Sequence, residues 1–277
     1  MNDTRRILIV TAVDAERDAV LRGLGDDPRF RVIAAGVGPA AAAAVTAATL
    51  ALSGAVPMGG EDEETGAAGA ETSNSASIAD ASAADASEGA SAAVGGVAGE
   101  RPSAAAGAHR PGGGYRLVVS AGIAGGFPGR AALGSLVVAD ELIAADLGVE
   151  TPGGFASVDE LGFGSSRAGV STRTAGALAA ALRAAGLPVV TGPVLTVTTA
   201  TGTPATAAEH LRRVPEAAAE AMEGFGVAAA ARHMGVPVLE LRAISNAVGP
   251  RDRDAWRIGD ALQALERGCA ILKEVLE

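Results

Sequence analysis

The chain has 277 residues and a net charge of −10, with 48% apolar but only 3% aromatic residues. This length allows one sizeable α/β domain or two small ones, with a core built mostly from aliphatic side chains. Residues 55–112 hold nine acidic residues against two arginines, so they carry −7 and leave −3 for the rest of the chain. The nearly neutral remainder predicts no nucleic-acid partner. A single cysteine, Cys269, excludes an intrachain disulfide and favours a reducing compartment.

Apolar runs typical of strands alternate with helical periods along the chain. We expect strands over 6–13, 30–35, 115–121, 133–139 (with 142–145 extending the sheet), 194–199, 218–222 and 236–245. We expect helices over 39–52, 172–185, 203–213, 224–234 and 254–276. This alternation predicts an α/β fold, a single domain with a central, largely parallel mixed sheet flanked by helices. In such sheets ligands bind beyond the carboxyl ends of the strands.

Residues 55–112 interrupt this pattern with a low-complexity segment that contains no Phe, Trp, Tyr or Leu. Such a segment cannot bury enough surface to offset its ordering entropy, so we expect a disordered insertion in a single domain spanning 1–277. A docking role for the insertion is the alternative. The uncharged stretch 32–60 consists mainly of Ala and Gly and is broken by Gly and Pro, which predicts no membrane span. The N-terminus shows no secretory pattern, so we expect a cytoplasmic protein.

Polar groups follow three of the expected strands, where catalytic groups collect. Glu16 comes just after the first strand, although a plain acid in the first turn of a surface helix would fit equally. Glu223 follows the short strand 218–222 and opens a helix. The glycines of 120–126 allow backbone N–H groups to approach a ligand closely, although a tight turn is the simpler interpretation.

Arg242 lies inside the apolar strand 236–245, where an unpaired charge would be costly. We expect it to meet a carboxylate, with Glu16 and Glu223 as candidates, either as part of a site or as a structural salt bridge. Ser245 and Asn246 end the same strand and can present polar groups to a ligand.

Other classes of site find little support in the sequence. His109 lies in the low-complexity segment, and His210 and His233 are expected on helix surfaces, which predicts neither a metal cluster nor a His-based triad. The spacing of Gly122, Gly125 and Gly126 does not match the dinucleotide fingerprint, and no phosphate-binding Gly-Lys-Ser/Thr occurs.

These motifs, in this order, resemble the nucleoside phosphorylase/nucleosidase superfamily. The matched segments are Ile7–Glu16, Gly36–Pro39, Ser120–Gly126, Gly134–Val137, Ala221–Gly224 and Arg242–Asn246. Finer features resemble the futalosine hydrolase family within it; they lie at 145–150, 194–203, 222–226 and 242–253. That resemblance implies hydrolysis of the N-glycosidic bond of futalosine, with release of hypoxanthine and dehypoxanthinyl futalosine in menaquinone biosynthesis. It also implies a homo-oligomer, a dimer or higher, that binds a small purine nucleoside and needs no metal or organic cofactor.

The resemblance also assigns roles to individual residues. Glu16 matches the general base that activates water, Glu223 matches the acid that binds ribose hydroxyls, and Arg242 orients the carboxylates. Met222 packs against the sugar, and Ser120 and Gly122 line the sugar and water site. Ser245 and Asn246 end the strand at the base, with Asn246 at the purine contact near N7.

Three alternatives remain open beside this interpretation. One is a methylthioadenosine/adenosylhomocysteine nucleosidase, in which the strand equivalent to 236–245 typically ends in Ser-Asp rather than Ser245-Asn246. Another is a purine nucleoside phosphorylase, and a third is a nucleoside-binding protein without activity. The residues that recognise the benzoate tail of the substrate are not defined by the pattern. Arg251 and Arg253 are candidates, with plain surface charge as the alternative.

Overall fold

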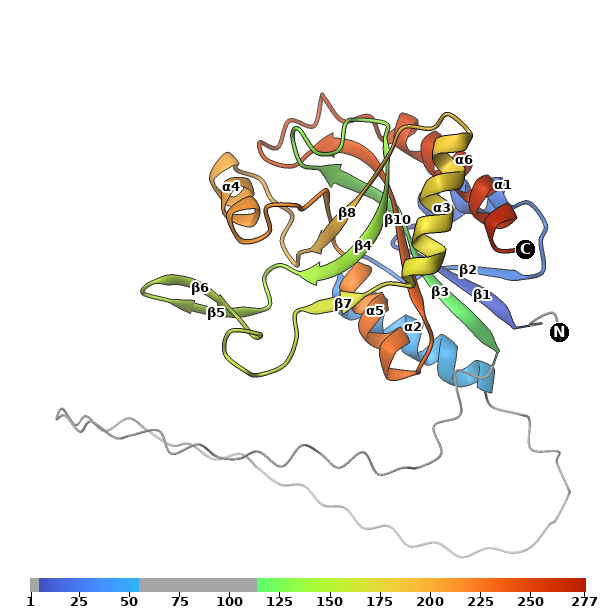
Figure 1. The fold of residues 1–277 in the computed structure, drawn as a ribbon, viewed down its shortest axis with the longest axis horizontal. Coiled ribbons are helices and arrows are strands. Elements are labelled where there is room, and N and C mark those ends of the chain that lie inside the picture. Colours follow the sequence, from blue (N-terminus) through green and yellow to red (C-terminus); the bar gives the residue numbers. More distant parts are fainter. Residues whose placement is uncertain (1–4, 55–113) are drawn as a thin grey trace, which may run out of the picture. The chain divides into compact units, whose positions relative to one another are not determined.

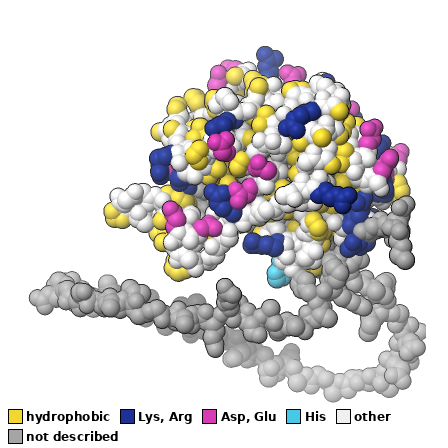
Figure 2. Space-filling view, in the orientation of Figure 1, with side chains coloured by type: hydrophobic (Ala, Val, Ile, Leu, Met, Phe, Trp, Pro, Cys, Tyr) yellow, Lys and Arg dark blue, Asp and Glu magenta, His cyan; other side chains and the backbone are white. Residues whose placement is uncertain are grey.

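The computed structural model describes residues 5–54 and 114–277. The expected insertion at 55–112 lies outside these residues, so its predicted disorder stays a prediction. Within the described residues no helix is long and apolar enough to cross a membrane. On the face shown in Figure 2, acidic and basic side chains are interspersed, as expected for a nearly neutral folded part.

An eight-stranded mixed sheet forms the centre of the fold. Its strands are β1 (Arg6–Thr11), β2 (Phe30–Ala34), β3 (Tyr115–Gly126), β4 (Leu136–Ala144), β7 (Arg167–Gly169), β8 (Val189–Thr196), β9 (Ala219–Ala221) and β10 (Val238–Ala247). The pairs β1–β2, β1–β3, β3–β10, β4–β8 and β8–β9 are parallel, whereas β4–β10, β3–β9 and β4–β7 are antiparallel. The predicted α/β class and the largely parallel, mixed character of the sheet are confirmed.

The sheet closes on itself, which corrects the expectation of a simple sheet flanked by helices. The order β10-β4-β8-β9-β3 returns to β10 because β10 also pairs with β3. The length of β3 makes this possible: one part pairs with β1, and Gly125 and Gly126 at its end pair with β9. Residues 122–126, expected as a glycine-rich loop, are therefore strand. Periodicity identifies strands but does not show which edges meet, so closure was not visible in the sequence.

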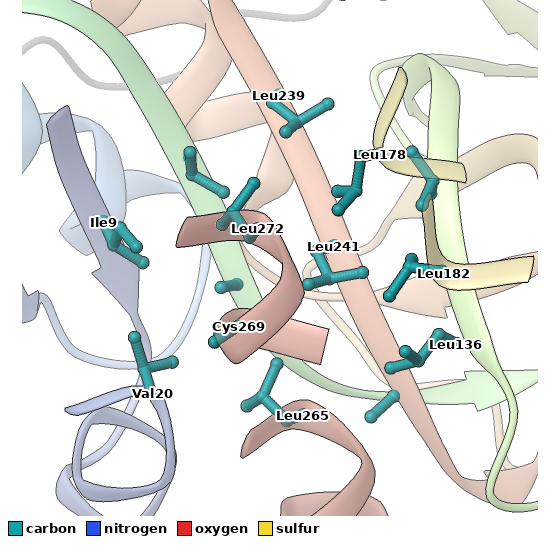
Figure 3. Packing of buried hydrophobic residues seen from close by; sticks show 14 of the residues in the cluster. Ile9, Val20, Leu136, Leu178, Leu182, Leu239, Leu241, Leu265, Cys269 and Leu272 are labelled. Carbon is teal, nitrogen blue, oxygen red and sulfur yellow. The ribbon is translucent and has the colours of Figure 1, made fainter. Parts of the chain in front are cut away.

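Helices cover the sheet on two sides (Figure 1). The helices α1 (Asp14–Leu24), α3 (Thr172–Ala184) and α6 (Ile258–Val275) share one core with the strands, whereas α2 (Pro39–Gly54) and α5 (Gly224–His233) pack on another. Figure 3 shows Leu265, Cys269 and Leu272 of α6 packed among core residues from β1, β10 and α3. Burial raises the pKa of the Cys269 thiol to about 12, so this cysteine is an inert core residue.

Most of the expected helices are confirmed, and nearby residues explain where two of them begin. Pro39 begins α2, as predicted. α4 (Pro204–Arg213) begins after Thr203, whose hydroxyl accepts a hydrogen bond from the N–H of Thr206. Three elements were not predicted: the full α1, the hairpin of β5 (Gly148–Thr151) and β6 (Gly154–Ser157), and β7. His210 of α4 is buried, which corrects its expected place on a helix surface.

The contact between α2 and α5 is close enough to require a glycine at 226. A Cβ there would overlap the carbonyl oxygen of Pro39 and lie 2.8 Å from its carbonyl carbon. We expect Gly226→Ala to lower the free energy of unfolding by about 1–3 kcal/mol, because backbone cannot yield as a flexible side chain would. Gly176→Ala in α3 is the matched control: its Cβ meets nothing within 4 Å, and removing a helical glycine should stabilise the fold by about 0.5–1 kcal/mol. Urea denaturation of both variants and of the wild type measures their free energies of unfolding. A Gly226→Ala variant as stable as the wild type would contradict the importance of this close contact.

Candidate functional site

The predicted residues gather at a cleft of about 350 Å³ at the carboxyl ends of β1, β3, β9 and β10. Its lining includes the predicted residues Glu16, Met222, Glu223, Ser245 and Asn246. A second cleft, of about 430 Å³, lies between the β5–β6 hairpin and α4 and is lined by none of the predicted site residues. The smaller cleft is therefore the candidate site.

Glu16 lies in the first turn of α1, only 3% exposed, with its carboxylate turned toward the sheet. Its Oε2 accepts hydrogen bonds from the N–H groups of Ala12 (2.9 Å) and Val13 (3.3 Å). Its Oε1 accepts from the N–H of Ile123 in β3 at 2.8 Å. Three backbone donors fix the carboxylate at the cleft, which excludes the alternative of an exposed acid on a surface helix.

Glu223 lies where β9 gives way to α5 and is 6% exposed. Its Oε1 accepts from the N–H of Gly38 at 3.2 Å, so the Gly36–Pro39 segment helps to hold it. Its Oε2 lies 3.3 Å from Nη1 of Arg242. The sequence expectation that Arg242 meets Glu223 is therefore confirmed.

Arg242 is fully buried and makes a closer pair that sequence reasoning missed. Its Nε donates to Oε1 of Glu240 at 2.7 Å, and its Nη2 donates to the Ser120 hydroxyl at 3.0 Å. Burial alone would lower the pKa of Arg242, but the carboxylates of Glu240, Glu223 and Glu16 together raise it above its ordinary value. Burial raises the pKa of Glu240. Its Oε2 has no hydrogen-bond partner within the described part of the chain.

Ser120 and Gly122 lie behind the cleft wall rather than in its lining. Ser120 is fully buried, and its hydroxyl meets Arg242 and, at 3.5 Å, Glu240. The lack of a side chain at Gly122 leaves room for the charged groups of Glu16 and Arg242. A Cβ there would lie 2.6 Å from Oε1 of Glu16 and 2.8 Å from Nη1 of Arg242. Ser120 and Gly122 were expected to contact a ligand. Instead, neither lines the cleft, and both lie beneath the carboxylates.

Ser245 and Asn246 line the cleft from the end of strand β10. The Ser245 hydroxyl is 2.8 Å from Oδ1 of Asn246 and 3.2 Å from the carbonyl oxygen of Ala124. Nδ2 of Asn246 donates to the carbonyl oxygen of Ala247 at 3.1 Å. Ser245 thus helps to fix the amide orientation of Asn246, which is half-buried at the cleft.

Glu220 and Thr201 line the cleft, although the sequence analysis did not single them out. Arg251, one of the two arginines that the sequence analysis named as candidates, also lines it, together with Trp256 in the loop after β10. The available signal for Glu220 was a single carboxylate in a run of alanines, since all three residues of the short strand β9 are buried. Within the described residues, no group of three or more His, Cys, Asp or Glu side chains could hold a metal ion.

The fold and motifs can be compared with known proteins. The family model described as "Phosphorylase superfamily" matches residues 20–277. The chain belongs to the phosphorylase superfamily. Within this superfamily, it is 58% identical over 163 residues to a futalosine hydrolase of Streptomyces coelicolor and 49% identical over 158 residues to one of Acidothermus cellulolyticus. These alignments cover 59% and 57% of the chain and span 67% and 64% of those relatives' lengths.

Solved structures of the superfamily show the same fold. A methylthioadenosine/adenosylhomocysteine nucleosidase of Colwellia psychrerythraea, in complex with adenine, superposes with a TM-score of 0.66 at 15% identity, covering 99% of this chain and 96% of that one. A futalosine hydrolase of Helicobacter pylori superposes with a TM-score of 0.64 at 14% identity, covering 99% and 97%. Because members with different names share the fold at such low identity, the fold does not choose among their activities.

The tight packing around Gly122 generates a prediction. We expect Gly122→Ala to displace Glu16 or Arg242 and to lower turnover at least tenfold, because a few tenths of an ångström at such groups matter for catalysis. Gly169→Ala is the control, since its Cβ meets nothing within 4 Å. Steady-state kinetics on a cleaved nucleoside, with circular dichroism to confirm folding, makes the comparison. Unchanged turnover in a folded Gly122→Ala variant would show that this close approach is not needed.

Proposed function

We propose that this chain hydrolyses the N-glycosidic bond of futalosine and releases hypoxanthine. The observation that carries the proposal is the convergence of Glu16 and Glu223 on one cleft that also holds the neutral amide of Asn246, with Arg242 buried behind at 3.3 Å from Glu223. The substrate is supported by the 58% and 49% identity to relatives named futalosine hydrolase.

Breaking a purine–ribose bond develops positive charge on the sugar and negative charge on the departing base. A carboxylate near the sugar stabilises the first, and a general base activates the attacking water. We assign the base to Glu16. Its backbone donors fix its position, and Oε1, which among the described residues accepts only the N–H of Ile123, keeps acceptor capacity for a water. This chemistry requires neither a metal nor an organic cofactor.

Glu223 is assigned to the ribose hydroxyls, with Met222 of the same cleft against the sugar. Arg242 lies behind both and does not line the cleft. Its contribution is to hold Glu223 at 3.3 Å and to compensate the negative charge of the carboxylates. Ser120 completes this support through its bond to Nη2 of Arg242.

Water is the favoured nucleophile over phosphate for an electrostatic reason. Glu16, Glu220 and Glu223 all line the cleft, and no arginine among its described lining residues other than Arg251 offsets them there. An incoming phosphate anion would be repelled by these carboxylates. Incubation with futalosine and phosphate, followed by chromatography, should show free hypoxanthine and no sugar 1-phosphate.

The benzoate tail of futalosine needs a cationic or polar partner. Arg251 lies at the cleft, and its guanidinium is 5.7 Å from the centre of the Trp256 ring. Arg253 lies 5.8 Å from the same ring. We assign the tail to this loop, because an arginine is well suited to a carboxylate and Trp256 offers an apolar surface beside it.

The role of Glu16 generates the central prediction. Glu16→Gln should keep the shape of the side chain but remove the base, lowering kcat on futalosine by roughly 10²- to 10⁴-fold with little change in KM. Asp14→Asn, in the same helical turn but at an exposed carboxylate that pairs with Arg17, is the matched control and should stay near normal. Near-normal kcat in folded Glu16→Gln would remove Glu16 from the mechanism.

Base preference depends on Asn246. An amide can donate to O6 or N7 of a 6-oxopurine, whereas an ionised carboxylate can only accept. Asn246→Asp would therefore place a carboxylate oxygen, an acceptor, against the acceptors O6 and N7 of the base. Such a mismatch costs about 1–3 kcal/mol when it is buried. The same change also loses the bond to the Ala247 carbonyl, so the ratio of kcat/KM for futalosine over its 6-amino counterpart is the informative measurement. The ratio should exceed one in the wild type and fall in the variant; an unchanged ratio would contradict the assignment.

A further inference from the structure

Glu220 is a buried carboxylate at the cleft that the mechanism above does not use. It is 7% exposed, and it lines the cleft together with Thr201. Oε1 accepts from the N–H of Thr201 at 2.8 Å, and Oε2 accepts from its hydroxyl at 2.5 Å. Two donors leave about half of the acceptor sites of a carboxylate unused. A buried acceptor with spare capacity at the wall of a binding cleft is suited to a donor on the ligand.

The sheet register places Glu220 beside Asn246. Gly125 of β3 pairs with Glu220 of β9 on one edge and with Asn246 of β10 on the other. Directly paired residues in neighbouring strands project from the same face of a sheet. The β3–β10 pairing is irregular between Ile244 and Asn246, but a Cβ at Gly125 would lie 3.2 Å from Nδ2 of Asn246, so this side chain is on the same face. Two strand spacings amount to about 10 Å, which leaves room between the two side chains for the edge of one base. The side chain of Val248 fills the space over Gly125 and closes the floor between them.

The groups around Glu220 keep it in place from behind. Nε2 of His210 lies 3.9 Å from Oε2, on the side of α4. Burial lowers the pKa of His210, and nearby Arg213 lowers it further. Burial raises the pKa of Glu220, opposed by the hydrogen bonds from Thr201, while the nearby Asp146 carboxylate raises it further. At 3.9 Å His210 lies beyond hydrogen-bonding distance, so the Thr201 donors leave the remaining acceptor sites of Glu220 available to the cleft that it lines.

We propose that Glu220 is a specificity-determining residue that accepts the N1–H of a 6-oxopurine, while Asn246 meets the O6–N7 side of the same base. This rests on the proposed cleavage of a purine nucleoside in the cleft. N1, O6 and N7 follow one another along one edge of hypoxanthine, so a carboxylate and an amide on neighbouring strands can hold that edge together. Adenine has an unprotonated N1, an acceptor, which Glu220 would face with another acceptor. The pair therefore selects for 6-oxo over 6-amino bases at two points.

The first test uses Glu220→Gln, with Glu216→Gln as the matched control. Glu216 is an exposed carboxylate near β9 that pairs with Arg130 away from the cleft. A neutral amide loses charge assistance and one acceptor, so kcat/KM for futalosine over its 6-amino counterpart should fall roughly 10- to 100-fold in Glu220→Gln. The control should keep the wild-type ratio. An equal loss on both substrates would show a merely structural role and overturn the proposal.

The second test needs no variant and so does not depend on folding of Glu220→Gln. Wild-type protein is titrated calorimetrically with hypoxanthine and with 1-methylhypoxanthine, which lacks the N1–H. Hypoxanthine should bind at least tenfold more tightly, and this difference should shrink in Glu220→Gln. Equal binding of the two bases by the wild type would overturn the proposal. If hypoxanthine shows this preference while futalosine is not cleaved, the proposed function fails and the assignment of Glu220 stands.

Discussion

The buried guanidinium of Arg242 is the interaction on which the rest of the site depends. A charge in the middle of an apolar strand is tolerated only when partners surround it. Here Glu240 meets Nε, Glu223 lies at Nη1 and Ser120 meets Nη2. Because these partners come from β10, from the start of α5 and from β3, one side chain ties together three of the elements that build the cleft.

Closure of the sheet is what makes this arrangement possible. A sheet opened between β10 and β3 would leave β10 paired with β4 alone and would separate it from β3. In the closed sheet β3 pairs with both β9 and β10 near its carboxyl end. The groups that follow these strands, Glu223 and Asn246, are thereby brought to one cleft with Glu16, which follows β1. The cost of burying Arg242 is thus offset by the same geometry that assembles the site.

The sequence predicted well those features that depend on local pattern. Strand and helix periods located most elements, and the rule that ligands bind at strand ends selected Glu16, Glu223 and Asn246. Features that depend on distant contacts were missed. One local pattern was missed as well: Glu240 lies two residues from Arg242 on the same face of β10, and its Oε1 accepts from Nε of Arg242 at 2.7 Å. Ser120, which the family resemblance placed at the sugar and water site, is instead fully buried in β3, where its hydroxyl meets Nη2 of Arg242.

The distribution of charge along the cleft suits a substrate whose sugar becomes positive while its base becomes negative. In the proposed mechanism, Glu16 and Glu223 face the sugar, which gains from carboxylates as it develops positive charge. Asn246, a neutral amide that accepts a hydrogen bond from Ser245, and Glu220, which accepts from Thr201, line the same cleft and are assigned to the base. A base that leaves with negative charge would be opposed by carboxylates on every side. An amide toward O6 and N7 supplies a donor where that charge develops, and a carboxylate is compatible only at the ring position that carries a proton. For a 6-oxopurine that position is N1, so under the proposed assignments the same arrangement would both help the base to leave and select which base is accepted.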